Sequence, residues 1–203
     1  VDYEAKLNLA RRWCKEWQFR IGVHYLRSQI SAKNAGVQYA ELAEITLSII
    51  WQEVLCEFAK KFGPEPGNGA AVISMGSLGS GVLHANSDLD LIIVYHADGN
   101  AQSEGDRSLS ARQYYSRLTK AFITAVSAPM TEGRLYEIDM RLRPSGFQGP
   151  VATSWSSYQN YQKNEAWVWE HLALTRARAV AGKVLLLNEF ENFRNSILKS
   201  YHR

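Results

Sequence analysis

Apolar residues in the first sixty positions recur at three- and four-residue steps, the spacing of a helix that buries one face. One such pattern extends from Asp2 to about Tyr25, and a second from about Val37 to Phe62. The second stops at the cluster Gly63-Pro64-Glu65-Pro66-Gly67, because this proline and glycine content cannot continue a helix. The pattern therefore predicts a helical segment over residues 1–66 that packs on the core formed by the following residues.

Beyond Gly67 the period of the apolar positions changes from that of a helix to that of strands. The short runs Ala71 to Met75 and Asp88 to Tyr95 are apolar almost throughout, which is typical of strands buried on both faces. The stretch Leu135 to Leu142 instead alternates strictly, and we expect a strand there with Glu137, Asp139, Arg141 and Arg143 on its polar face. These strands predict a sheet core over residues 67–152.

Helical spacing returns once between the strands and again after them. The predicted helices are Ser110 to Ser127, Ser154 to Lys163, Glu165 to Val180 and Val184 to Lys199. We expect the aromatic residues between 154 and 178 to lie mostly in the core, and His171 to be a hydrogen-bonded structural residue. The chain is thus predicted to be α/β, a small mixed sheet with helices before it and a helical segment over residues 153–203 after it.

Composition narrows the class of protein. With 23 basic and 20 acidic residues the formal charge is +3, too small to indicate binding to nucleic acid or to a membrane. Apolar runs of a few residues do not reach the roughly 20 needed to cross a bilayer, and Cys14 and Cys56 fit reduced core thiols of a cytoplasmic protein. The chain begins at Val1 rather than methionine, which favours a fragment of a longer protein.

Asp88 and Asp90 are the first candidates for chemistry, because they open a strand that is otherwise apolar. At a period of two their side chains point to the same side, with Cα atoms about 7 Å apart. Two such carboxylates repel each other, and a divalent cation relieves that repulsion. The alternative is that both residues only open a strand at the solvent edge.

Asp139 supplies a third carboxylate, flanked by Arg141 and Arg143. Three aspartates on two strands have the ligands to hold two magnesium ions, with the arginines beside them for phosphate. The alternative is an exposed sheet face that carries a ladder of opposite charges.

The turn Gly76-Ser77 follows the first strand and precedes a segment that fits one short helix. Its backbone N–H groups and hydroxyl are suited to a polyphosphate. It matches neither a P-loop nor a dinucleotide fingerprint. A plain strand-to-helix turn is the alternative.

The order of these features, Gly-Ser, then Asp-x-Asp, then a third Asp on a later strand, resembles the polymerase β-like nucleotidyltransferases. Longer stretches resemble the glutamine synthetase adenylyltransferase family. The sequence of the block from Ser127 to Gly146 resembles its C-terminal, adenylylating half more than its N-terminal, deadenylylating half. The resemblance covers about Val72 to Gly182. The segments on which the resemblance depends are Met75 to Gly79, Ser87 to Leu91, Ser127 to Gly146, Gly149 to Ala152 and Trp169 to Arg178.

The resemblance implies an enzyme that moves AMP from ATP to a tyrosine hydroxyl of glutamine synthetase and releases pyrophosphate. It implies that Asp88, Asp90 and Asp139 hold two Mg²⁺ ions, and that Asp139 also orients or deprotonates the tyrosine. Gly76 and Ser77 are expected to hold the leaving pyrophosphate, and Arg141 or Arg143 to neutralise charge or to contact the acceptor. In the full-length enzyme a PII-type signal protein and glutamine are implied as effectors.

Two alternatives remain at this stage: the phosphorolytic, deadenylylating half of the same enzyme, and a catalytically silent regulatory domain that binds nucleotide. One departure from the family pattern follows the turn. Where the family has a second consecutive glycine and an Arg-Glu pair, this chain has Ser80-Gly81-Val82.

Overall fold

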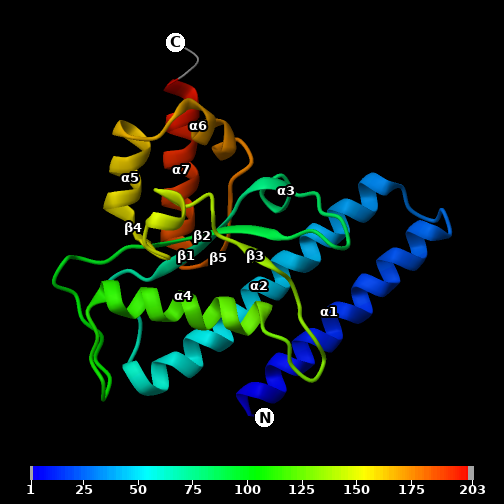
Figure 1. The fold of residues 1–203 in the computed structure, drawn as a ribbon, viewed down its shortest axis with the longest axis horizontal. Coiled ribbons are helices and arrows are strands. Elements are labelled where there is room, and N and C mark those ends of the chain that lie inside the picture. The colour runs from blue at the N-terminus through cyan, green and yellow to red at the C-terminus, as the bar shows by residue number, and fades with distance from the viewer. Residues whose placement is uncertain (1, 201–203) are drawn as a thin grey trace.

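The computed structural model describes residues 2–200, without the side chain of residue 147. A mixed sheet lies at the middle of the molecule, with helices on both of its faces (Figure 1). The strands are β1 (Ala70–Ser74), β2 (Leu89–Tyr95), β3 (Ile138–Asp139), β4 (Thr153–Ser154) and β5 (Arg178–Gly182). Their order is β3-β2-β1-β5, and β4 also pairs with β2. The predicted α/β fold with a small mixed sheet is confirmed.

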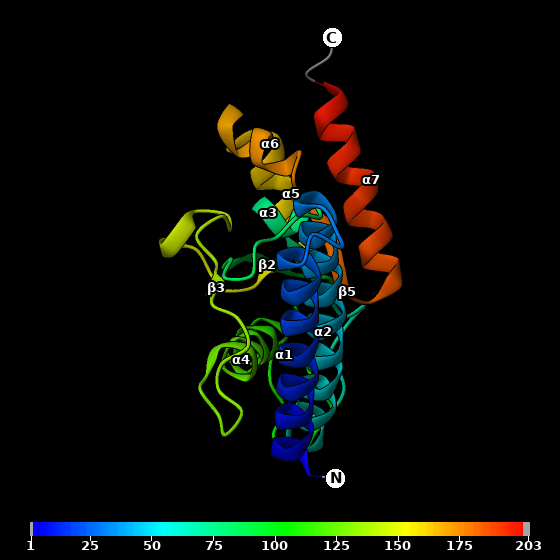
Figure 2. The ribbon, with the colours of Figure 1, turned by 90° about the vertical axis from the view of Figure 1, so that its right-hand side faces the viewer.

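One face of the sheet is covered by a lower layer, which consists of α1 (Tyr3–Leu26), α2 (Ala32–Phe62) and α4 (Ala111–Ser127). The other face carries an upper layer of α5 (Trp155–Asn164), α6 (Val168–Leu174) and α7 (Val184–Ser200). The two layers lie on opposite sides of the sheet in both views (Figures 1 and 2). The short helix α3 (Gly76–Gly79) follows β1, and a 3₁₀ turn covers Gly146–Gln148.

Successive residues of the central strands alternate between the two layers. On β1, Val72 packs with the lower layer and Ile73 with the upper one, and on β2 Ile93 and Ile92 do the same. A sheet buried on both faces needs apolar residues at every position, which is why these strands read as continuous apolar runs. β1 pairs antiparallel with β2 and β5, whereas β3 and β4 pair parallel with β2.

The two N-terminal helices begin at capping side chains. Asp2 accepts a hydrogen bond from Glu4 N at the start of α1, and Ser31 accepts one from Asn34 N at the start of α2. The second helix therefore starts five residues before the predicted Val37, because the serine cap and the following polar turn carry no apolar period. Among residues 2–200, no helix combines the length and apolar character that crossing a bilayer requires.

Several expectations were wrong in their detail. The predicted helix from Glu165 to Val180 is α6 followed by the edge strand β5, which forms because its small residues pair with β1, Ala181 opposite Val72. The strand expected over Leu135 to Leu142 is only Ile138–Asp139, because its partner β2 begins at Leu89 and the chain turns away at Arg141. Cys56 is exposed, while Cys14 is buried as predicted.

The aromatic residues of the upper layer divide into two groups. Trp155 and Tyr158 lie in the core, in contact with Phe190 and Phe193, as expected. Trp167 and Trp169 do not lie there, because 72% and 59% of their surfaces are exposed. The boundaries predicted at residues 66 and 152 stay predictions, although the sheet does draw β5 from beyond the second of them.

Candidate active site

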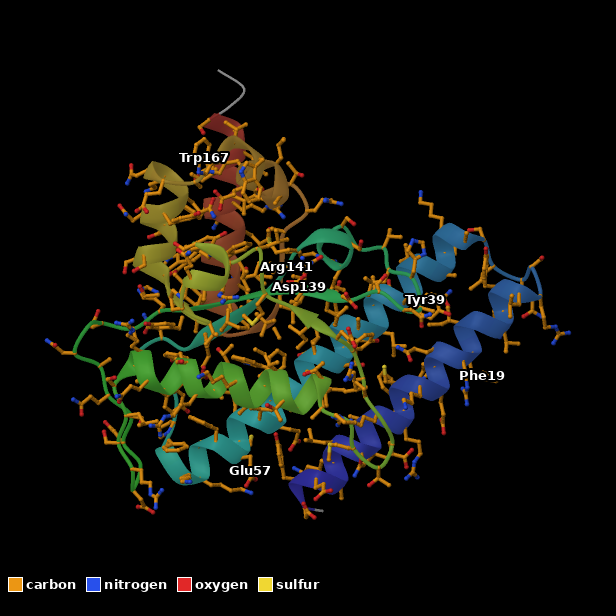
Figure 3. The ribbon with its side chains drawn as sticks, viewed as in Figure 1. Phe19, Tyr39, Glu57, Asp139, Arg141 and Trp167 are labelled. Atoms are coloured by element: carbon orange, nitrogen blue, oxygen red, sulfur yellow. The ribbon has the colours of Figure 1, made fainter. Side chains whose placement is uncertain are left out.

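The parallel pairing of β2 with β3 brings two of the three aspartates together. Asp90 and Asp139 are register partners on these neighbouring strands, as Leu89 and Ile138 are before them. Register partners on adjacent parallel strands project to the same face of a sheet. Asp88 precedes β2 and is exposed. Figure 3 shows Asp139 and Arg141 at the middle of the molecule, below the upper layer.

The glycine turn lies against Asp90. Gly76 has a φ of +56°, and a Cβ placed on it would overlap the Asp90 carboxylate. Met75 N donates a hydrogen bond of 2.8 Å to Asp90 O, which ties the turn to β2. The N–H groups of Gly76 and Ser77 belong to the first turn of α3, where a helix has no acceptors of its own. Only glycine admits both this backbone conformation and this close approach.

The two paired carboxylates have opposite pKa shifts. The pKa of Asp90 is raised above its usual range, first by burial and then by the negative charge of Asp139, with a smaller part from Asp88. The pKa of Asp139 is lowered, chiefly by the hydrogen bond from the Arg141 side chain. Asp139 is therefore firmly ionised at neutral pH, and Asp90 is the carboxylate that gains most from an added positive charge.

The two arginines after β3 have different surroundings. The exposed Arg141 grips Asp139, with Nη2 at 2.5 Å and Nε at 2.6 Å from Oδ2, while its backbone N donates to Oδ1 at 2.8 Å. Arg143 is buried and donates to Met140 O at 2.8 Å and to Gly149 O at 3.3 Å. The strict alternation that put both on one face ends with β3, because the chain turns at Arg141.

The donor set fits a hard divalent cation, because it consists of carboxylate oxygens held close enough to disturb one another's pKa. Within residues 2–200, however, no three His, Cys, Asp or Glu side chains stand close enough together to hold a metal ion as they are placed. Arg141 supplies the positive charge beside Asp139 instead. The donor chemistry therefore suits magnesium, and engaging Asp139 in a shared site requires Arg141 to move.

The sequence pattern does not predict the pair Arg178 and Glu44, which supports the helix that follows the glycine turn. Arg178 on β5 reaches Glu44 on α2 and donates from Nη2 to Leu78 O at 3.2 Å. Helix α3 is thereby tied to the lower layer and to the edge strand. Nothing in the local pattern pairs residues 134 positions apart, so only the fold could reveal them.

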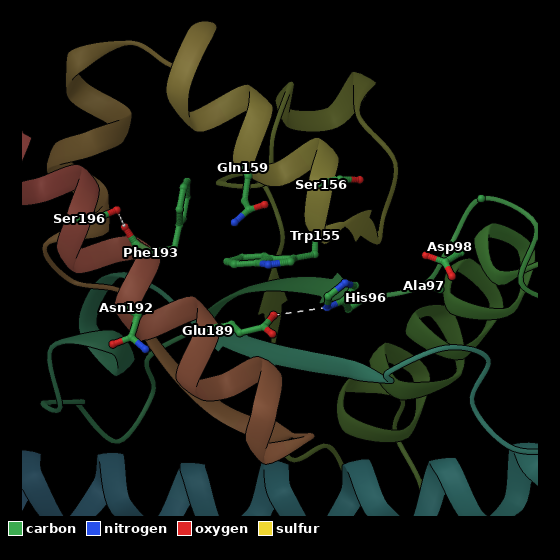
Figure 4. Close-up of a pocket in the computed structure, with 11 residues that line it drawn as sticks. His96, Ala97, Asp98, Trp155, Ser156, Gln159, Glu189, Asn192, Phe193 and Ser196 are labelled. Carbon is green, nitrogen blue, oxygen red and sulfur yellow. Dashed lines mark hydrogen bonds and ion pairs between the residues drawn. The ribbon is translucent and has the colours of Figure 1, made fainter.

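A larger cavity of about 700 Å³ lies away from the carboxylates (Figure 4). Trp155 lines it, together with His96 and Glu189, whose Nδ1 and Oε2 atoms lie 3.3 Å apart. His96 follows the last residue of β2, whereas Asp90 is near its start, so the strand separates the two places by about 20 Å. This cavity plays no part in the carboxylate site.

Comparison with known proteins shows the family to which the chain belongs. The family model described as glutamate-ammonia ligase adenylyltransferase matches residues 1–193. Relatives named bifunctional glutamine synthetase adenylyltransferase/adenylyl-removing enzyme include that of Mesorhizobium japonicum, 46% identical over 190 residues, and that of Agrobacterium fabrum, 44% identical over 197. These matches cover 93% and 97% of this chain but 19% and 20% of the relatives, so the chain spans about a fifth of their length. The chain therefore belongs to the glutamate-ammonia ligase adenylyltransferase family.

Proposed function

We propose that this chain transfers AMP from ATP to a tyrosine hydroxyl of glutamine synthetase. The observation that carries the proposal is the pairing of Asp90 with Asp139 on adjacent strands, directly beside the turn at Gly76, in a chain of this family. In the reaction the tyrosine oxygen forms a bond to the α-phosphorus, and the bond from that phosphorus to the β-phosphate oxygen breaks. Pyrophosphate leaves, and the phenol proton passes to a carboxylate or to water.

The acceptor explains why an ionised carboxylate is needed. A tyrosine phenol has a pKa of about 10 and is almost fully protonated at neutral pH. Asp139, whose pKa is lowered, is ionised there and can orient the phenol or accept its proton. In this proposal Gly76 and Ser77 direct backbone N–H groups towards the departing pyrophosphate.

Asp88, Asp90 and Asp139 would hold Mg²⁺, which supplies charge neutralisation for the phosphate oxygens and for the attacking oxygen. With Mg²⁺ bound, Arg141 would no longer pair with Asp139 and could contact phosphate or the acceptor. Arg143 serves this site through the loop that it holds, because its guanidinium donates to Met140 O and Gly149 O.

The printed name of the relatives also covers removal of the adenylyl group. The same carboxylates would serve that reaction, in which phosphate attacks the tyrosine-bound AMP and ADP leaves. Regulation of the full-length enzyme by a PII-type protein and by glutamine is part of the proposal, without an assignment to any residue described here.

The test is an intact-mass measurement of the acceptor. The chain is incubated with MgCl₂ and either ATP plus unmodified glutamine synthetase, or phosphate plus the adenylylated form. The proposal expects the first mixture to gain one AMP per modified tyrosine and to release pyrophosphate. Loss of AMP in the second mixture alone would assign the removing reaction. No metal-dependent pyrophosphate in the first and no ADP in the second would indicate a silent domain.

A further inference from the structure

A small pocket of about 290 Å³ lies between α5, α6 and the loop after β3, next to the carboxylate site. Met75, which precedes the glycine turn, and Arg141, which grips Asp139, both line it. Its apolar walls are Ile92, Leu142, Ala173 and Leu174. At this volume it is at the small end of ligand pockets, which suits a ring system and not a stretch of polypeptide.

Two buried polar atoms in residues that line this pocket have no hydrogen-bond partner. Gln162 is only 6% exposed and its Oε1 is unpartnered, and Tyr158 is 1% exposed and its hydroxyl is unpartnered. Buried polar groups are nearly always hydrogen-bonded, because leaving one unpaired costs stability. Two such groups around one pocket indicate a ligand that supplies their partners.

The neighbouring polar groups already have partners, so recognition falls to these two residues. Glu170 accepts from Tyr161 Oη and from Trp167 N, both at 2.8 Å. His171 Nε2 donates to the backbone carbonyl of Gln162 at 2.8 Å, which fixes the end of α5 against α6. The main chain at Gln162 is thus held in place while its side-chain oxygen remains unpaired.

The rim of the pocket is aromatic. Trp167 and Trp169 line it and expose 72% and 59% of their surfaces, although indoles of this size are usually covered. Figure 3 shows Trp167 on the upper layer, above Asp139 and Arg141. Exposed indole faces are stacking platforms for flat rings such as nucleic-acid bases.

We infer that this pocket binds the adenine ring of ATP, with the 6-amino group donating to Gln162 Oε1 and the ring stacked on Trp167 or Trp169. The inference rests on the proposed function for the identity of the nucleotide. Guanine carries a carbonyl oxygen where adenine has the amino group, so with the Gln162 amide oriented as in this structure it would place two acceptors face to face. Gln162 is therefore the residue that selects ATP over GTP.

The experiment measures equilibrium binding of ATP, GTP and base-free tripolyphosphate, each with MgCl₂, to the 203-residue chain by titration calorimetry. The test variant is Gln162→Met, which is unbranched and of similar size. Its matched control is Gln159→Met on the same helix, where the side chain lines the separate cavity near His96. Thermal unfolding of each variant confirms that the fold is retained, as expected when the substituted oxygen has no partner.

We expect Gln162→Met to weaken ATP binding about tenfold and to abolish the preference over GTP, because one hydrogen bond is lost. Tripolyphosphate binding should not change, and Gln159→Met should bind all three ligands as the wild type does. Unchanged affinity and preference in Gln162→Met would overturn the inference, as would a wild-type chain that does not prefer ATP.

A second readout uses the tryptophans. ATP should quench their fluorescence, and tripolyphosphate should not. The variants Trp167→Phe or Trp169→Phe should reduce the quenching, whereas Trp17→Phe on α1 should not.

The intact-mass assay of glutamine synthetase distinguishes failure of this inference from failure of the proposed function. Transfer of AMP by a Gln162→Met chain with unchanged ATP selectivity sinks the inference alone, and ATP-selective binding without transfer sinks the function alone. If Gln162→Met instead raised the KM for glutamine synthetase and left nucleotide binding unaltered, the inference would be wrong, and the pocket would be assigned to the acceptor tyrosine.

Discussion

The two layers differ in how their buried polar side chains are hydrogen-bonded. In the lower layer Tyr114 donates to Gly63 O at 3.0 Å and Tyr115 to Pro66 O at 2.7 Å, and the fully buried Arg11 reaches four carbonyl oxygens. In the upper layer the Tyr158 hydroxyl and Gln162 Oε1 have no partner. The lower layer also holds three buried polar atoms without a partner, Asn8 Oδ1, Trp51 Nε1 and Thr119 Oγ1, but none of these residues lines the cavity near His96 or the pocket at Gln162.

This difference separates a scaffold from a binding surface. Partnered polar groups stabilise a layer, because each hydrogen bond replaces one lost to water on burial. Unpartnered groups beside a pocket cost stability and are useful only when a ligand completes them.

The largest expected effect is on catalysis. Asp88→Asn, Asp90→Asn and Asp139→Asn should each lower the rate of AMP transfer at least about 100-fold, since each removes a charge-stabilising group. Their unfolding midpoints should stay near the wild type. Asp98→Asn, in the exposed loop beyond β2, is the control and should keep full activity. Turnover like the wild type in all three variants would exclude the site.

The largest effect on stability is expected from Arg11→Met in the lower layer. Arg11 is 0% exposed and donates to Leu7, Ala125, Ala128 and Gly133. Removing the guanidinium leaves these carbonyls without that partner, which should lower the free energy of unfolding by about 2–4 kcal/mol. Urea denaturation followed by circular dichroism measures it, and a loss below about 1 kcal/mol would contradict the view of this layer as the scaffold.

A matched pair of tyrosines makes the comparison sharper. Tyr115→Phe removes a hydrogen bond of 2.7 Å and should cost about 1 kcal/mol. Tyr158→Phe removes a buried hydroxyl without a partner and should leave stability unchanged or slightly higher. Both are read from the same denaturation curves. Equal losses in the two variants would mean that the layers do not differ in this respect.

The smallest effect concerns alkaline pH. Burial raises the pKa of Tyr115 above its ordinary value of about 10, so the folded state favours the neutral phenol. Its contribution to stability is complete below pH 10 and is lost as the pH rises towards the folded pKa. The free energy of unfolding should therefore fall above pH 10, less steeply in Tyr115→Phe. Identical slopes in the two proteins would remove Tyr115 as a cause.

Helices and strands whose apolar residues repeat regularly within the segment could be predicted from the sequence. The extent of α4, α5 and α7 and the buried character of β1 and β2 follow from residues within each segment. The strand β5 could not be predicted in this way, because Ala179, Val180 and Ala181 suit a helix as well as a strand until β1 pairs with them. The different surroundings of Arg141 and Arg143 depend likewise on the turn after β3, which the alternating pattern concealed.

The candidate site divides along the same line. The sequence alone determines which residue types are present and in what order: Gly76-Ser77, then Asp88 and Asp90, then Asp139. Carboxylates and a glycine turn indicate their chemistry before any tertiary contact is known. The register that sets Asp90 beside Asp139, the grip of Arg141 and the unpaired oxygen of Gln162 were decided only by the tertiary structure. Hydrogen bonding and burial depend on groups far apart in the sequence, which no local pattern contains.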